Sequence, residues 1–195
     1  MTTTIWLILV AVALVLGVAG AWFVMRRRRR EHLKARFGPE YDRTVRRSHG
    51  TREAEKELED REERVEQLHI HPLTASDRTR FTEGWRTVQS HFVDEPEHAV
   101  GEADELVQEV MERRGYPIGD FEQRAADVSV HHPTVVSNYR AAHAVATRSR
   151  RAGVRTEDLR QAMVHYRALF DDLLEPGTHD GHNPKESNDD RRGVA

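Results

Sequence analysis

The longest apolar segment of the chain runs from Ile5 to Met25 and contains no charged side chain over 21 residues. As a helix that rises ~1.5 Å per residue, it would span ~30 Å, which matches the hydrocarbon core of a bilayer. Trp6 lies near one end and Trp22 near the other, where amphipathic rings favour the membrane interfaces. The pattern predicts a single N-terminal transmembrane helix.

The charges that flank this segment predict its orientation. Only Met1 to Thr4 precede it, whereas Arg26, Arg27, Arg28, Arg29 and Arg30 follow it directly. Positive flanks stay on the cytoplasmic side, so we expect the N-terminus outside and everything after the arginines in the cytoplasm. A cleaved signal peptide would carry its charges before the apolar run. We therefore expect residues 1–30 to be a retained membrane helix with a cytoplasmic arginine flank.

Residues 31–72 are dominated by charged side chains. Gly38-Pro39 interrupts a helix there, because glycine and proline are unfavourable inside helices. The segment from Arg52 to Leu68 has one thin apolar stripe, which Arg61 interrupts. We interpret 31–72 as charged juxtamembrane helices, acting as a solvated stalk or a weak coiled coil.

Apolar positions at helical spacing recur four times between residues 73 and 175. The first stripe follows Thr74, which forms an N-terminal box with Asp77. A shorter helix is expected from Asp120 to about Val128. The four main helices are expected at about 75–92, 96–113, 133–150 and 156–174. Without any alternating strand pattern, the predicted fold class is all-α, a small bundle of about four main helices.

The remaining composition limits the function classes. Residues 176–195 have almost no apolar side chains, so a disordered tail is expected. Residues 31–195 carry 25 basic and 33 acidic residues, a balance of −8, which disfavours nucleic-acid binding. The chain contains no cysteine. His69 and His71 lie two residues apart, and His131 and His132 are adjacent. Neither pair has the i, i+4 spacing of a helical metal site, so we expect no metal and no cofactor.

Several short motifs resemble an uncharacterised family of small bacterial proteins, many of them membrane-anchored. The resemblance covers roughly residues 33–174 and implies a bacterial origin, hence an inner-membrane location. It implies no activity and no site residues. The matching runs are Phe37-Gly-Pro-Glu-Tyr-Asp-Arg43, Trp85-x-x-Val-Gln89, Phe92-Val-Asp-x-Pro96, Arg114-Gly-Tyr-Pro117, Tyr139-Arg-x-Ala-His143 and His165-Tyr-Arg-x-Leu-Phe170.

Four aromatic or polar side chains on the buried stripes are the candidate ligand pocket: Trp85, Tyr139, His143 and Tyr166. A polar network enclosed in the core would use the same residues. We find no catalytic motif and name no catalytic residue.

Two further features concern partners. Ala13, Gly17 and Ala21 form a strip of small side chains through which two membrane helices could pack as a homodimer. Arg148, Arg150, Arg151 and Arg155 form a second basic cluster, either a solvated loop or a contact with anionic lipid. Our leading hypothesis is a non-enzymatic module that binds a protein partner at the membrane. A ligand-binding or catalytic bundle is the alternative.

Overall fold

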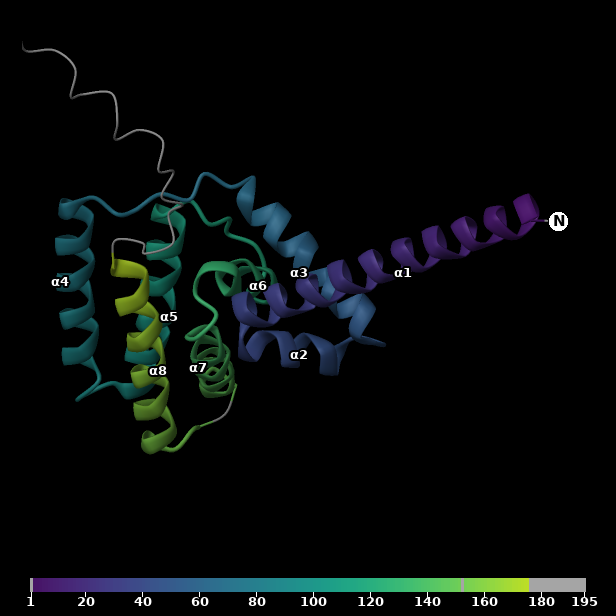
Figure 1. Cartoon of the computed structure of the whole chain (residues 1–195). Coiled ribbons are helices and arrows are strands. Elements are labelled where there is room, and N and C mark those ends of the chain that lie inside the picture. The colour runs from purple at the N-terminus through teal and green to yellow at the C-terminus, as the bar shows by residue number, and fades with distance from the viewer. Residues whose placement is uncertain (1, 152, 176–195) are drawn as a thin grey trace, which may run out of the picture. The chain divides into compact units, whose positions relative to one another are not determined.

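The computed structural model describes the backbone of residues 2–151 and 153–175, and side chains from residue 14 onward within those ranges. In these residues the chain forms eight helices and no strand, which confirms the all-α prediction (Figure 1). The helices are α1 (Thr2–Phe37), α2 (Pro39–Arg47), α3 (Thr51–Glu66), α4 (Ala75–His91), α5 (Pro96–Arg113), α6 (Phe121–His131), α7 (Val136–Ser149) and α8 (Thr156–Leu174). They divide into two compact units, residues 1–63 and residues 64–195.

Helix α1 carries the apolar run and the arginines on one uninterrupted helix. Its side chains from residue 14 to residue 32 are all exposed. Among the described residues, none of the helices combines the length and the apolar content that a bilayer crossing needs. Residues 5–13 of the predicted span, with Ala13 of the predicted dimer strip, have no described side chains.

The first unit is held by a small core beyond the apolar run. Helix α1 ends at Phe37 and α2 begins at Pro39, as the Gly38-Pro39 pair predicts. Gly38 has a φ of 47°, which favours glycine, and it lets the chain reverse between the two helices. The core side chains, each no more than 2% exposed, are Leu33, Phe37, Tyr41, Ala54 and Leu58.

Helix α3 carries a buried apolar stripe within a strongly charged sequence. Its thin apolar stripe is buried, with Leu58 fully enclosed. Arg61, which interrupts the stripe, is only 4% exposed and donates to the carboxylate of Glu40 at 3.3 Å. Glu40 lies on α2, so the charge that compensates the buried Arg61 comes from a neighbouring helix. The solvated stalk and the weak coiled coil both stay predictions. The domain boundaries at 30/31 and 72/73 stay predictions.

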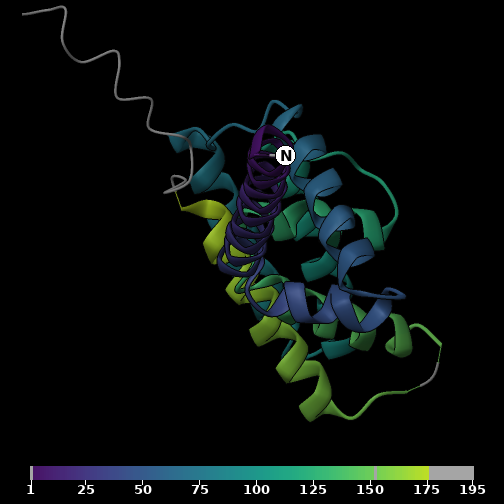
Figure 2. The same cartoon turned by 45° about the vertical axis from the view of Figure 1, so that its right-hand side comes forward.

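The second unit is a helical bundle, as the four apolar stripes predict. Helix α8 packs against α5 and α7, and α4 packs against α5 (Figures 1 and 2). Its core includes Phe81, Trp85, Tyr139, Tyr166 and Phe170. Thr74 is the N-cap of α4, as its position predicts, because its hydroxyl accepts from the backbone N–H of Asp77 at 3.1 Å.

The segment before α4 and the turn after α5 lie in close backbone contact. Gly115 follows α5 with a φ of 96°, and a Cβ at this position would overlap the carbonyl oxygen of His69. The N–H of His71 donates to the carbonyl of Arg114 at 3.0 Å. Only glycine therefore lets the segment before α4 lie against the turn after α5. The predicted disordered tail, 176–195, lies outside the described residues.

Candidate functional site

The polar centre of the bundle is the carboxylate of Asp104 on α5. The neighbouring inward positions of α5, such as Val100 and Val107, are fully buried, and Asp104 is only 4% exposed. The hydroxyl of Tyr166 on α8 donates to Asp104 Oδ1 at 2.9 Å. A buried carboxylate requires such donors, because burial removes the water that would otherwise stabilise its charge.

His143 approaches the same carboxylate from α7. Its Nδ1 lies 3.5 Å from Asp104 Oδ1, a long contact. Its ring stacks on Phe121, with centroids 3.7 Å apart and planes 6° apart. The His143 side chain is 20% exposed, so it is the member of the group that reaches solvent. The stack limits rotation of the imidazole, and the carboxylate can orient it.

Tyr139 lies beside Tyr166 in a T-shaped arrangement, with ring centroids 6.2 Å apart. Arg124 Nε lies 3.5 Å from the Tyr139 hydroxyl, to which it donates, and Arg124 Nη1 donates to the carbonyl of Gly119 at 2.5 Å. Tyr139 is fully buried. Helices α5, α6, α7 and α8 therefore each contribute a polar group to one enclosed cluster.

Burial strongly affects both tyrosines of the cluster. Desolvation raises the pKa of Tyr166, and the charge of Asp104 raises it further. Desolvation also raises the pKa of Tyr139, although the Arg124 hydrogen bond opposes this shift. Both hydroxyls therefore remain protonated at physiological pH. They can donate and accept hydrogen bonds there, but neither is available as a phenolate.

Three of the four predicted pocket residues meet in this cluster, and the fourth lies apart. The ring of Trp85 stacks on Phe170 with centroids 4.8 Å apart, and the guanidinium of Arg167 lies 5.5 Å from its centroid. In the described part of the chain, its ring contacts do not include Tyr139, His143 or Tyr166. Trp85 is a core residue between α4 and α8.

Sequence reasoning missed the two ionic residues of the cluster, Asp104 and Arg124. Both lie on apolar stripes at helical spacing: Asp104 between Val100 and Val107, and Arg124 between Phe121 and Val128. A charged side chain on a buried stripe was the available signal. Its partner could not be read from the spacing, because the partner lies on another helix.

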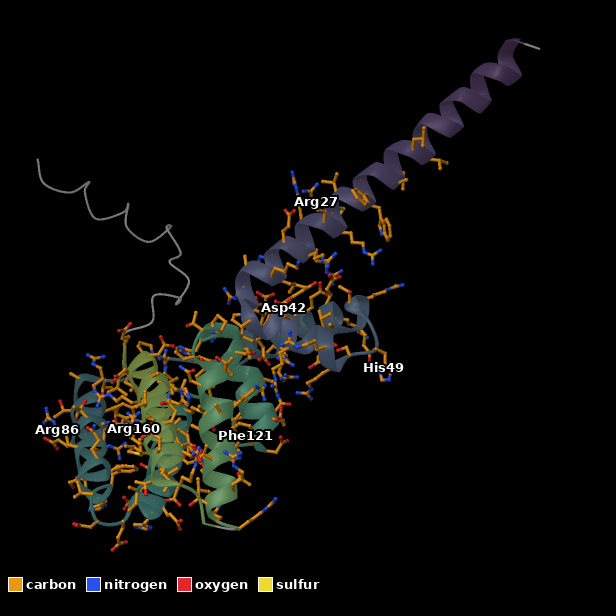
Figure 3. All side chains as sticks on the ribbon, turned by 90° about the horizontal axis from the view of Figure 1, so that it is seen from below. Arg27, Asp42, His49, Arg86, Phe121 and Arg160 are labelled. Atoms are coloured by element: carbon orange, nitrogen blue, oxygen red, sulfur yellow. The ribbon has the colours of Figure 1, made fainter. Side chains whose placement is uncertain are left out.

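The exposed arginine flank forms ion pairs within the first unit. Arg29 forms an ion pair with Glu59 on α3, and Arg30 lies 3.7 Å from Glu55. Arg27, which is labelled in Figure 3, pairs with Glu31 on its own helix at 2.9 Å. Helix α3 therefore neutralises part of the charge that the sequence assigns to the membrane surface.

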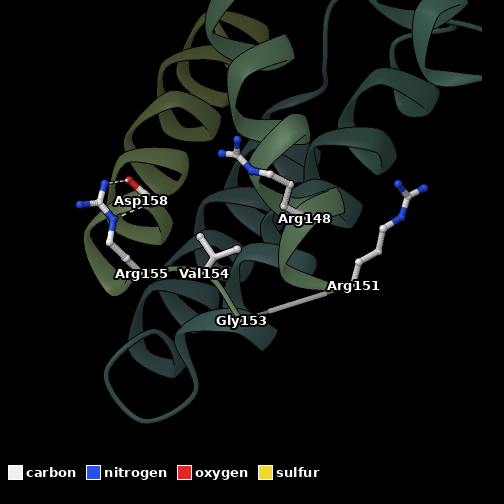
Figure 4. A pocket seen from close by; sticks show the side chains of 6 residues that line it. All are labelled: Arg148, Arg151, Gly153, Val154, Arg155 and Asp158. Carbon is white, nitrogen blue, oxygen red and sulfur yellow. Dashed lines mark hydrogen bonds and ion pairs between the residues drawn. The ribbon is translucent and has the colours of Figure 1, made fainter.

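Two surface hollows lie away from the Asp104 cluster. One, beside the start of α8, is lined by Arg148, Arg151, Gly153, Val154, Arg155 and Asp158 (Figure 4). The other lies where the first turns of α5 and α8 meet Val154. In the described residues, no three His, Asp or Glu side chains are grouped as metal ligands. Neither hollow includes a predicted pocket residue.

No family model, curated protein or solved structure matches this chain.

Proposed function

We propose that the chain is a single-pass, membrane-anchored helical module that binds a protein partner at the cytoplasmic face of a bacterial inner membrane. One observation carries the proposal: α1 exposes a continuous set of large apolar side chains. These are Leu14, Val15, Leu16, Val18, Trp22, Phe23, Val24 and Met25, each at least 48% exposed. These side chains make a surface that water disfavours and lipid accepts. In the sequence, the uncharged run extends back to Ile5.

The charge at the base of this segment supports the proposed orientation. Arg26 lies over the Trp22 ring at 5.4 Å, an arrangement suited to the membrane interface. Arg29 and Arg30 are paired with α3, yet their charges still oppose translocation, because the positive-inside rule depends on Lys and Arg and little on acidic residues. The folded part of the chain then lies on the cytoplasmic side.

The enclosed Asp104 cluster favours an interaction module over an enzyme. Tyr139 and Tyr166 are fully buried, and their hydroxyls are engaged with Arg124 and Asp104. Such a network specifies how helices pack and leaves few groups for a substrate. Anchoring would confine the bundle to a thin layer and raise its effective concentration for partners there.

Membrane insertion can be tested by extraction of the expressed chain. We expect it to stay with bacterial membranes in alkaline carbonate, and a C-terminal reporter to be active only in the cytoplasm. A Leu16→Arg/Val18→Arg variant should be released, because each arginine costs about 3 kcal/mol at the helix centre. Val93→Arg, at a position 82% exposed in the turn between α4 and α5, is the control. Release of the unaltered chain from the membrane by carbonate would refute the anchor.

The partner can be sought separately by crosslinking in native membranes. We expect the same protein to be captured when an unrelated single-pass helix replaces residues 1–25, because the folded part carries the binding. Capture that is lost with the replaced helix would place the interaction in the membrane. Absence of any specific partner in both cases would contradict the proposed function.

A ligand-binding bundle is the second candidate, favoured by one specific observation. His143 is part-exposed, stacked on Phe121 and close to a buried carboxylate, an arrangement that could orient an imidazole toward a ligand. Thermal-shift screening of small molecules would test it. A ligand should stabilise the unaltered chain and lose its effect on His143→Ala. A ligand that stabilises both equally would argue against this site.

A further inference from the structure

We infer that the basic surface between α7 and α8 docks the bundle onto an anionic lipid leaflet. This surface consists of Arg148, Arg150, Arg151 and Arg155, all of them exposed. The inference rests on the proposed function, because the membrane anchor is what brings the surface near lipid. It adds a second, electrostatic contact between the chain and the membrane.

The first support is the concentration of positive charge. Residues 64–175 carry 14 arginines and 19 acidic residues, so this part of the chain has a net charge of −5. Four of those arginines lie within residues 148–155, a segment without any acidic residue. In a unit that anionic surfaces repel overall, this segment is where attraction is concentrated.

The arrangement of the guanidinium groups is the second support. Arg155 forms a two-bond pair with Asp158 at 2.9 and 3.1 Å, and Arg150 donates to Thr147 at 3.3 Å. The guanidinium groups of Arg148 and Arg151 point in different directions and do not converge on one point (Figure 4). A single phosphate would need converging donors, whereas a leaflet offers many phosphates spread over a plane.

The expected strength of the contact fits a tethered domain. Each arginine near an anionic surface raises the ratio of membrane-docked to undocked bundles by about fivefold. This attraction falls off over a Debye length, and added salt weakens it. Arg148 and Arg151 by themselves would be too weak to recruit a free protein. They are sufficient to bias the position of a domain that an anchor already holds beside the bilayer.

The absence of cysteine allows a direct test with the full chain. Gly153→Cys introduces a label next to the basic surface, where a side chain meets no atom within 4 Å. An environment-sensitive fluorophore at this position should shift to the blue in proteoliposomes that contain phosphatidylglycerol. We expect no shift in phosphatidylcholine alone, and loss of the shift at high salt. Gly101→Cys on α5 also has open space and is the control position.

Charge variants make the test specific. Arg151→Gln should lower the docked-to-undocked ratio about fivefold, and Arg148→Gln/Arg151→Gln should lower it further. Arg86→Gln removes an equal charge from the exposed face of α4 and should leave the ratio unchanged (Figure 3). Equal effects of Arg86→Gln and Arg151→Gln would overturn the assignment to this surface.

The remaining outcomes separate this inference from the anchor. Chains that resist carbonate extraction but show no blue shift would leave the anchor intact and overturn the docking surface. Chains released by carbonate would refute the anchor itself. Single-stranded RNA is the competing polyanion. If it shifts the label on the detergent-solubilised chain while phosphatidylglycerol vesicles do not, the lipid assignment is wrong.

Discussion

Asp104 shows at the residue scale how a single buried charge organises this bundle. It is 4% exposed, accepts a hydrogen bond from Tyr166 and lies near His143. The free energy required to bury its charge is offset only while those neighbours are present. Substitutions of Tyr166 or His143 should therefore lower the free energy of unfolding by more than the lost side-chain packing alone would.

The two buried tyrosines provide a matched comparison. Tyr166→Phe removes a 2.9 Å hydrogen bond to a carboxylate and should lower the free energy of unfolding by about 1.5 to 3 kcal/mol. Tyr139→Phe removes only a 3.5 Å contact with Arg124, and the expected loss is about 1 kcal/mol or less. Denaturant unfolding of the chain in detergent measures both. Equal losses would show that packing, rather than the bond to Asp104, sets the effect.

The raised pKa values of Tyr139 and Tyr166 predict lower stability at alkaline pH. Both exceed the ordinary value of 10.0, mainly because burial disfavours the charged phenolate. Above about pH 10 the unfolded chain loses these protons while the folded chain keeps them, so stability falls as pH rises. The slope is on the order of 1.4 kcal/mol per pH unit for each tyrosine.

This pH effect can be measured as the thermal unfolding midpoint between about pH 9 and about pH 11. Tyr166→Phe removes one of the two contributions and should make the decline shallower. If the decline is equally steep in Tyr166→Phe, that tyrosine ionises in the folded chain and is not enclosed as described.

Helix α3 shows at the element scale why charge pattern alone is a poor guide to packing. It pairs through Glu55, Glu59 and Glu62 with basic side chains of α1, and it also buries Leu58. Exposed ion pairs contribute about 1 kcal/mol or less, whereas a buried leucine contributes several times more. The apolar contact should therefore hold the helix, and the ion pairs should select its neighbour.

Two substitutions on α3 separate these contributions. Leu58→Ala should destabilise the first unit by about 2 to 5 kcal/mol, because it leaves a cavity in a small core. Glu62→Gln removes the pairs with His32 and Arg36 and should cost about 1 kcal/mol or less. Hydrogen exchange of α3 amides is the measurement. Faster exchange in Glu62→Gln than in Leu58→Ala would reverse this ranking.

At the scale of the whole molecule, the chain consists of two units with separate buried cores. The core of the second unit extends from Leu73 to Leu173, so every member lies within residues 64–175. The contact of Arg64 with the buried Asp127, at 3.1 Å, also lies within this range. Nothing in this core requires the apolar part of α1.

Residues 64–175 should therefore fold when expressed without the anchor. We expect a helical circular dichroism spectrum and one cooperative thermal transition. A shorter fragment, 73–175, lacks Arg64 and the His71 hydrogen bond to Arg114. Its midpoint should be lower by several degrees, which corresponds to about 1 kcal/mol in a domain of this size. An unfolded 64–175 fragment would contradict two independently folding units.

The local features of this chain could be predicted from its sequence alone. The 3.6-residue stripes located the helices of the bundle, Gly38-Pro39 located the break after α1, and Thr74 located the start of α4. These features depend on residues no more than four positions apart, so the physics that determines them is contained in short stretches of sequence. The same stripes placed Tyr139 and Tyr166 correctly in the core.

Tertiary structure alone decided which polar residues meet. Arg61 pairs with Glu40, Tyr166 with Asp104 and Arg29 with Glu59, all between different helices. Such pairings depend on how helices cross and on their register, which periodicity does not contain. A chain that is 32% charged offers many alternative partners for each of these residues. Packing selects among them, because only a partner that the fold brings into contact can compensate a buried charge.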